Sequence, residues 1–368
     1  MTLRILVVGA GIAGLAAARG LRVAGFRPDV VEALPASMSP GAGIYLPGNA
    51  SRALRLLGLD VPLRPLGDLI FRQVFLDSRG RELFEMDVAG LWAGVGESRA
   101  LSRADLQQVL LTGVGGEVRY ETEVRDVQII EGAAKVEFST GAIAEYDLVV
   151  GADGRKSTIR DKIGLGGPAT PTGQIVYRAV VSGGPPLTDW TAVLGRRAQF
   201  VAMPMGGRKI YCYADETAPE TPAPADPSER MQEVFGEFGG PIPAILERIE
   251  KVSVARTDEV VLPAWSRGPV VLVGDAAHAT APTLAQGAAM SFEDGWVLGQ
   301  ELRRAEPDIP AALRAYEERR RPRCSEVRDR TRERDRTRDV PPTLRDPMLR
   351  RRGLRIFTDH YKGLVTPV

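Results

Sequence analysis

The stretch Gly9-Ala10-Gly11-Ile12-Ala13-Gly14 decides the fold of this chain. It follows a short β-branched run at residues 4–8 and opens the alanine- and leucine-rich residues 12–24, a pattern typical of a strand leading into a helix. In such a GxGxxG turn the first glycine permits the tight turn, the second lets a pyrophosphate approach the backbone, and the third lets the helix pack closely on the sheet. The unpaired N–H groups and partial positive charge at the helix start then favour phosphates.

A second strand is expected over residues 28–32, which completes a strand–helix–strand unit and predicts a parallel sheet. Glu32 ends this strand, 18 residues after Gly14, where its carboxylate can accept hydrogen bonds from ribose hydroxyls. Its charge disfavours the 2′-phosphate of NADP. A purely structural glycine turn is the alternative, and the motif alone does not separate FAD from NAD. The residues predicted to bind the nucleotide here are Gly9, Gly11, Ala13, Gly14 and Glu32.

The bulk composition limits the possible partners and compartment. The 48 basic and 47 acidic side chains leave a net charge of +1, which gives no reason to expect nucleic acid or an anionic membrane as partner. The two cysteines lie too far apart in sequence for a metal-ligand spacing, and two histidines exclude a histidine-rich site, so no metal is expected. A single disulfide is possible, but a reducing cytoplasm is the expected location.

The longest apolar run, residues 5–18, is 14 residues long and too short to span a bilayer. It imitates a signal peptide, because Arg4 precedes it and small residues end it. The three glycines inside the run fit the nucleotide turn instead.

The 368 residues exceed what one hydrophobic core usually supports, so two lobes are expected. The fold class is α/β (α+β), with a Rossmann-like parallel-sheet lobe interrupted by a mostly antiparallel lobe, and a C-terminal helix. Residues 49–51 can cap a helix that runs through Leu57, and residues 216–227 form a surface loop rich in proline and acidic residues. The expected ranges are 1–67, 99–169 and 266–340 for the nucleotide lobe, 68–98 and 170–265 for the substrate lobe, and 341–368 for a C-terminal tail.

Residues 314–339 hold 11 arginines and seven acidic residues. A nucleic-acid arm would be less interleaved with acids. The apolar positions stop after Val327, which favours a solvated helix that leaves the core.

Two further turns follow strands in the same way as the first. Gly151-Ala152-Asp153-Gly154 follows residues 146–150, and Gly274-Asp275 follows residues 270–273. A tight turn in which Asp153 bonds its own backbone is the structural alternative. Asp275 at the carboxyl end of a strand can accept hydrogen bonds from a polyol chain.

Taken in order, these motifs resemble those of the single-component FAD-dependent monooxygenases of the p-hydroxybenzoate hydroxylase fold. The resemblance is strongest to the branch of salicylate hydroxylase, kynurenine monooxygenase and zeaxanthin epoxidase. It spans residues 3–335 and includes residues 41–49 and 101–106. Ala289 departs from it, because many relatives carry asparagine there.

The resemblance implies that the bound dinucleotide is FAD. Gly11 and Glu32 would serve its ADP half, and Arg103 its diphosphate and ribityl region, with Gln107 on the same helix face. A surface charge at a helix start is the alternative for Arg103. The resemblance also implies that Asp153 would hold FAD and assist the encounter with NAD(P)H, and that Asp275 would bind the ribityl chain or the pyrophosphate. The backbone of Gly287 and Ala288 would lie against the isoalloxazine. Gly43 and Pro282 are further implied cofactor-binding residues.

The implied activity is hydroxylation or epoxidation of an electron-rich, aromatic or polycyclic small molecule by NAD(P)H and O2, through a flavin hydroperoxide. Candidate catalytic or pocket residues are Tyr211 and Tyr213, which share one face of a predicted strand, and Arg178, which can steer a carboxylate. Ordinary strand packing is the alternative for the tyrosines. We interpret His278 as structural. Two other classes stay open: an FAD-dependent oxidase or reductase without oxygen insertion, and a flavin-binding protein without turnover. A monomer or homodimer is expected.

Overall fold

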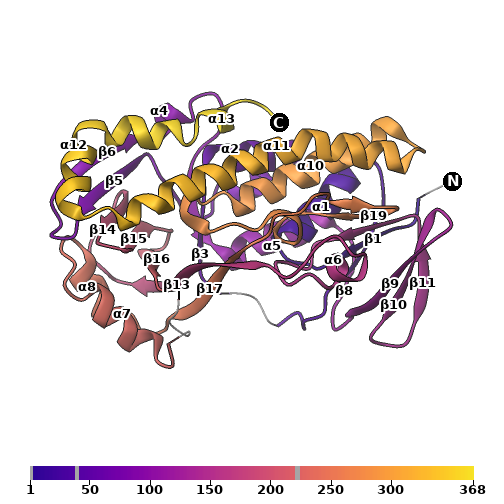
Figure 1. Cartoon of the computed structure of the whole chain (residues 1–368), viewed down its shortest axis with the longest axis horizontal. Coiled ribbons are helices and arrows are strands. Elements are labelled where there is room, and N and C mark those ends of the chain that lie inside the picture. The colour runs from indigo at the N-terminus through magenta and orange to yellow at the C-terminus, as the bar shows by residue number, and fades with distance from the viewer. Residues whose placement is uncertain (1–2, 38–40, 220–223) are drawn as a thin grey trace.

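A six-stranded sheet carries the glycine turn (Figure 1). The computed structural model describes residues 3–37, 41–219 and 224–368. In spatial order the strands are β18 (Ser266–Arg267), β19 (Val270–Leu272), β12 (Leu148–Gly151), β1 (Ile5–Val8), β2 (Asp29–Val31) and β8 (Val118–Arg119). Every neighbouring pair is parallel except β18 with β19. The parallel sheet predicted from the strand–helix–strand start is confirmed.

The register of this sheet brings the three sequence motifs to one edge. Val8 lies beside Gly151, and Gly151 lies beside Leu272. Because parallel strands end at the same edge, the turns that follow these strands are neighbours there. Strands β1 and β12 are buried on both faces, as is typical of parallel strands covered by helices.

Helices α1 (Ile12–Val23) and α10 (Gly287–Ala305) pack backbone to backbone. A Cβ atom added to Gly20 would lie 1.9 Å from the carbonyl oxygen of Gly295, and one added to Gly299 would lie 2.4 Å from that of Gly20. Any side chain at these positions would force the helices apart. We call these three glycines the glycine seam, and it holds the N-termini of both helices in a fixed relation.

A seven-stranded sheet forms the other end of the molecule (Figure 1). Its strands in order are β17 (Ser253–Glu259), β13 (Thr170–Ser182), β16 (Lys209–Thr217), β15 (Ala198–Pro204), β14 (Trp190–Leu194), β5 (Arg72–Asp77) and β6 (Glu82–Asp87). All pairs are antiparallel except β14 with β5. One face packs on α7 (Pro227–Phe235) and α8 (Ile242–Leu246) through side chains such as Tyr177, Cys212 and Phe200.

Smaller elements complete the fold. Two three-stranded sheets consist of β3 (Gly43–Leu46), β7 (Arg99–Ser102) and β4 (Asp68–Leu69), and of β11 (Ile143–Tyr146), β10 (Ala133–Phe138) and β9 (Val124–Ile130). The short helices are α2 (Gly48–Leu56), α3 (Asp60–Leu63), α4 (Val88–Leu91), α5 (Arg103–Val114), α6 (Thr158–Lys162), α9 (Asp275–His278), η1 (Pro282–Leu284) and η2 (Thr337–Asp339).

Two local expectations are corrected. Helix α2 begins at Gly48 after Pro47, so Asn49 lies inside the helix and does not cap it. Strand β16 extends to Thr217, which shortens the loop expected over residues 216–227. Within that loop, residues 220–223 lie outside the described residues.

The arginine-rich segment is not merely a solvated helix. It belongs to α11 (Ile309–Arg336), which runs along much of the molecule's length (Figure 1). Arg320 is fully buried and Arg334 is 6% exposed, while Arg338 of η2 is also buried. Because the buried positions after Val327 are filled by Thr331, Arg334 and Arg338 and not by apolar residues, the apolar pattern ends at Val327 although the chain still faces the interior.

Residues 341–368 carry helices α12 (Pro342–Asp359) and α13 (Lys362–Val365). Phe357 of α12 packs on Phe75 and Phe84 of the seven-stranded sheet, with ring centroids 4.6 and 4.8 Å away. Arg323 of α11 donates to the carbonyl oxygens of Gly363 and Leu364. Among the described residues, no helix combines the length and the apolar character needed to cross a bilayer.

Candidate active site

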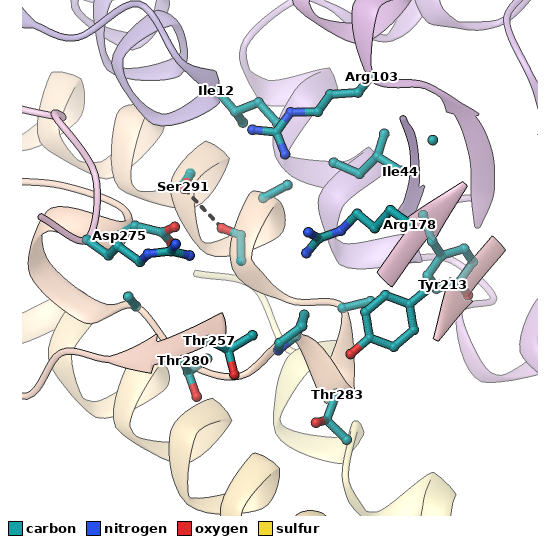
Figure 2. Close-up of a pocket in the computed structure, with 18 of the residues that line it drawn as sticks. Ile12, Ile44, Arg103, Arg178, Tyr213, Thr257, Asp275, Thr280, Thr283 and Ser291 are labelled. Atoms are coloured by element: carbon teal, nitrogen blue, oxygen red, sulfur yellow. Dashed lines mark hydrogen bonds between the residues drawn. The ribbon is translucent and has the colours of Figure 1, made fainter. Parts of the chain in front are cut away.

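A cavity of about 360 Å³ lies between the carboxyl edge of the parallel sheet and the seven-stranded sheet. Its walls come from both lobes: Gly11, Asp275 and Gly287 on one side, and Arg178, Tyr211 and Tyr213 on the other. Figure 2 shows Arg103 and Arg178 pointing into the same space from different elements, with Asp275 at the far side. The cavity therefore joins the nucleotide motifs to the β-rich lobe.

The three glycines of the turn have different surroundings. A Cβ atom on Gly9 would lie 2.5 Å from the Ala152 carbonyl oxygen, and one on Gly14 would lie 1.8 Å from the Gly9 carbonyl oxygen. A Cβ atom on Gly11 would meet nothing within 4 Å. Gly9 and Gly14 are therefore needed by the fold itself, whereas Gly11 leaves the N-terminus of α1 open toward the cavity. Ala13, two residues further, also lines the cavity.

Glu32 binds the turn that precedes α1. Its carboxylate accepts from the N–H of Ala10 at 2.7 Å and from that of Leu34 at 3.0 Å. Gln107 of α5 donates to the carbonyl oxygen of Ala10 at 3.5 Å. Each Glu32 oxygen keeps a second lone pair for a hydroxyl donor, so the predicted contact to ribose is compatible with this arrangement.

The carboxylate of Asp153 accepts hydrogen bonds from residues that follow it closely in the chain. Its carboxylate accepts from the Ser157 hydroxyl at 2.5 Å and from the Ile159 N–H at 3.0 Å, at the start of α6. Burial raises the pKa of this carboxyl group, and the hydrogen bonds from Ser157 and Ile159 oppose that rise. The neighbours Ala152 and Gly154 line the cavity. These contacts tie the carboxylate to the start of α6, four to six residues further along the chain.

The Gly274-Asp275 turn places an exposed carboxylate at the cavity. Gly274 has a φ of +59°, and a Cβ atom there would lie 2.4 Å from that of Ala13. Its N–H donates to Asp294 of α10 at 2.9 Å. Asp275 follows at the start of α9, so the position of its side chain depends on the hydrogen bond that the Gly274 N–H donates to Asp294.

A buried amide pair fixes the turn before α10. Asn49 Nδ2 donates to Gln286 Oε1 at 2.8 Å, and Gln286 Nε2 donates back to Asn49 Oδ1 at 3.3 Å. Ala285 occupies the left-handed region with a φ of +53°. Gly287 faces open space, and with Pro282 and Ala288 it lines the cavity. The N-terminus of α10 therefore faces the same space as that of α1.

Two arginines, Arg103 and Arg178, extend into the same part of the cavity (Figure 2). Arg103 begins α5, and burial followed by the repulsion of Arg178 lowers its pKa. Its Nε is buried without a hydrogen-bond partner among the described residues. Arg103 is therefore not a surface charge, and the pair favours an anion between them. Gly43 lies beside them, and a Cβ atom there would lie 2.2 Å from the Tyr211 ring.

Tyr211 and Tyr213 face the cavity from β16, as their shared strand face predicts. Arg178 lies directly opposite Tyr213 in the sheet. Burial raises the pKa of both hydroxyl groups, so each stays protonated at neutral pH. The Tyr213 hydroxyl lacks a well-aligned hydrogen-bond partner in the described part of the chain, with Asp215 and Arg338 nearby.

A buried ionic network supports the Gly274 turn from below. Asp294 accepts from His278 at 2.6 Å and from Arg320 at 2.8 Å, and Arg320 also donates to Glu293 at 2.6 Å. Burial alone would raise the pKa of Asp294, but His278 and Arg320 hold it at about 2. Against the effect of burial, Cys324 and Asp294 raise the pKa of His278 well above its ordinary value. His278 is thus part of an internal support.

His278, Asp294 and Cys324 bring possible metal-ligand atoms within 4.8 Å of one another. The Asp294 oxygens already accept from Gly274, His278 and Arg320. A cation there would also meet the Arg320 guanidinium, so the cluster fits an ion-pair network better than a metal centre.

Sequence reasoning missed this network and the Asn49–Gln286 pair. Glu293 and Asp294 are adjacent acids in an otherwise apolar stretch of α10, which was the available signal. Their shared partner Arg320 lies 27 residues after Glu293 and 26 after Asp294, in a segment whose charges gave no hint of burial.

The chain matches the model of the FAD binding domain family over residues 2–331. It is 33% identical over 325 residues to aurachin C monooxygenase/isomerase of Stigmatella aurantiaca, which covers 86% of this chain and 84% of that protein. It is 32% identical over 345 residues to 3-hydroxybenzoate 6-hydroxylase of Polaromonas naphthalenivorans, covering 86% of this chain and 83% of that protein.

A solved structure has the same fold over nearly the whole chain. It is that of HpxO of Klebsiella pneumoniae complexed with FAD and uric acid. The TM-score is 0.81 at 26% identity, and the match covers 99% of this chain and 92% of the other.

Proposed function

The chain belongs to the FAD binding domain family, a flavoprotein family with monooxygenase members, and from this premise we propose that its cavity hydroxylates or epoxidises an electron-rich aromatic or polycyclic molecule. FAD is the cofactor, and NAD(P)H and O2 are the proposed co-substrates. The observation that carries the proposal is the single cavity that joins Gly11, Asp275 and Gly287 to the side chains of the seven-stranded sheet. A redox cofactor and a small substrate can meet only in such a shared space.

The residues present fit FAD. Two helices, α1 and α10, turn their N-termini to the cavity, and a Cβ atom added to the glycine at each, Gly11 or Gly287, would meet nothing within 4 Å. Arg103 adds a half-buried cationic side chain whose buried Nε has no hydrogen-bond partner among the described residues. Backbone donors, helix dipoles and an arginine suit the diphosphate of FAD and the oxygen and nitrogen acceptors of its flavin ring.

We assign the cofactor contacts as follows. Gly11, Ala13 and Glu32 hold the ADP half, with Gly9 and Gly14 shaping the turn. Arg103 and Gln107 serve the diphosphate region, and Asp275 with Pro282 the ribityl chain. The remaining assigned positions are Gly43, Asp153, Gly287 and Ala288. Bound FAD supplies the redox chemistry and the activation of oxygen.

The side chains of the sheet orient the substrate and exclude water. Tyr211 and Tyr213 remain neutral donors because burial raises the pKa of both. They can donate hydrogen bonds to a phenolic or carbonyl oxygen of the substrate. Arg178 supplies positive charge on the same face of the sheet. Trp190, Val201 and Met203 add apolar wall, which keeps water from the reacting atoms.

The test begins with the purified protein. It should contain or take up FAD, and a panel of phenolic acids, N-heteroaromatics and polycyclic phenols should include at least one compound that accelerates NAD(P)H oxidation without equal release of peroxide. Colourless protein that takes up no FAD refutes the family-based assignment for this chain. Holoenzyme that oxidises NAD(P)H only with full peroxide release, or not at all with every compound, favours an oxidase, a reductase or a binding protein.

Asp275→Ala tests the cofactor contact. Because the side chain is exposed at the cavity, we expect flavin affinity to fall about tenfold while stability changes by less than about 0.5 kcal/mol. Asp161→Ala, an exposed acid of α6, is the control. Unchanged flavin content in Asp275→Ala would remove this contact.

We further propose a cytoplasmic protein, as a monomer or homodimer. Both cysteines, Cys212 and Cys324, are free and buried, which fits a reducing compartment.

A further inference from the structure

Arg334 of α11 lines the cavity at the end formed by the seven-stranded sheet. Its guanidinium lies over the ring of Phe357 at 4.1 Å and over that of Phe75 at 5.7 Å. Phe75 in turn contacts Trp190, another cavity residue, with ring centroids 5.3 Å apart. Arg334 therefore belongs to the aromatic end of the cavity and comes from α11, outside the nucleotide motifs.

Arg334 forms no ion pair with a carboxylate in the described part of the chain, although Asp335 lies near enough to attract its charge. No carboxylate oxygen there lies within 4 Å of its guanidinium, although the side chain is buried. The adjacent acids are taken: Glu333 pairs with Arg330, and Asp335 pairs with Arg338. Arg338 itself also pairs with Asp215. The Tyr361 side chain is hydrogen-bonded to Arg334 but is neutral.

The pKa of the neighbouring His360 is lowered by burial and by the same positive charge. Burial and the proximity of Arg334 lower the pKa of His360 to about 4, so that His360 stays neutral. Buried charges in proteins are normally paired, and aromatic faces compensate a cation only in part. An arginine that is buried, lines a cavity and has no carboxylate partner among the described residues is therefore suited to a planar anion that enters the cavity.

We propose that Arg334 is the anion-recognising residue of the substrate site, and that the substrate carries a planar anionic oxygen group, such as a carboxylate, at the end of its ring system away from the flavin. This inference builds on the proposed function and names its substrate class. The Tyr213 hydroxyl, buried in the same cavity without a well-aligned partner, provides a neutral donor for the same molecule. Trp190 offers an aromatic wall for its ring.

The experiment compares binding of acids with that of their amides, which match in shape and lack the charge. Holoenzyme is titrated with benzoate and benzamide, and with 2-naphthoate and 2-naphthamide, by calorimetry and by the flavin absorbance change. Wild-type protein should bind at least one acid ten times or more as tightly as its amide. If neither acid is preferred by that margin, the inference is wrong.

Arg334→Met should reduce the preference to less than about twofold and leave amide binding within twofold of wild type. Arg334→Lys, which keeps the charge and guards against a folding defect in the methionine variant, should retain a preference of at least threefold. Arg336→Met removes an exposed arginine from the same helix and should change nothing.

Two outcomes overturn the proposal. Either Arg334→Met keeps the full preference, or Arg178→Met abolishes it while Arg334→Met does not, which would place anion recognition on β13. A protein that fails to take up FAD refutes the proposed function instead, so the two failures are distinguishable.

Discussion

The glycine turn before α1 and the arginine-rich helix α11 both shape the cavity, but they do so in opposite ways. At the turn, side chains are absent, and main chain meets main chain within a few ångströms of Gly9 and Gly14. At α11, the largest cationic side chains reach into the interior, and Arg320 is fully buried among Glu293 and Asp294.

The comparison teaches that close backbone contacts and buried ion pairs tolerate different substitutions. A glycine forced close to backbone has no substitute, since every other residue adds a Cβ atom. A buried ion pair can in principle be exchanged for apolar residues, but removing one partner alone leaves an uncompensated charge. The predictions below follow the resulting loss of unfolding free energy, from the largest to the smallest.

Arg320→Met should have the largest effect. It leaves Glu293 and Asp294 buried without their shared partner, and we expect a loss of about 3–5 kcal/mol in the free energy of unfolding, measured in urea. Arg330→Met on the same helix removes only an exposed pair with Glu333 and should cost less than about 1 kcal/mol. Equal losses in the two variants would show that the ionic support is not specific to the buried arginine.

Gly14→Ala should come next. Its Cβ atom would lie 1.8 Å from the Gly9 carbonyl oxygen, so backbone must move, at a cost of about 1–3 kcal/mol. Flavin content should fall with it, because α1 is displaced from the turn. If Gly14→Ala unfolds at the wild-type urea concentration and retains FAD, the steric account of this turn fails.

His278→Gln should change the pH dependence of stability. The folded-state pKa of His278 is raised, so its contribution is complete below about pH 6.5 and is lost as the pH rises through the folded-state value. Unfolding free energies from pH 6 to 9.5 should therefore fall by about 1 kcal/mol or more in wild type relative to His278→Gln. Parallel curves for the two proteins would contradict this ionic role.

Gly11→Ala should have the smallest effect on folding. A Cβ atom meets nothing within 4 Å, so the unfolding free energy should change by less than about 0.5 kcal/mol. Flavin affinity should nevertheless fall about tenfold, because the new methyl group occupies the space over the α1 N-terminus. A stability loss as large as that of Gly14→Ala would erase the distinction between the two glycines.

The same contrast explains what could be predicted from the sequence. The turn, the parallel sheet and the convergence of Asp153 and Asp275 at one edge follow from local spacing and from the rule that parallel strands end together. Arg320 and Arg334 could not be placed, because a charged residue on a helix reads as solvated unless its distant partner is known. Asn49 was misjudged for the same reason: its partner Gln286 lies 237 residues away.

The candidate site divides in the same way. Its nucleotide half is built from short motifs whose local geometry can be predicted from residue type and spacing. Its substrate half depends on the faces of seven strands from separate parts of the chain. The alternation of β16 predicted that Tyr211 and Tyr213 share a face, but nothing in the sequence predicted that Trp190 and Arg334 would line the same cavity.

The glycine seam between α1 and α10 has a consequence for how the molecule can move. Helices that meet through side chains can slide when rotamers change, whereas here peptide groups touch peptide groups at Gly20, Gly295 and Gly299. The starts of the two helices are thus held at a fixed spacing. We therefore expect an opening that admits a substrate to come from the seven-stranded sheet and the helices behind it, while the spacing between the two helix starts stays constant.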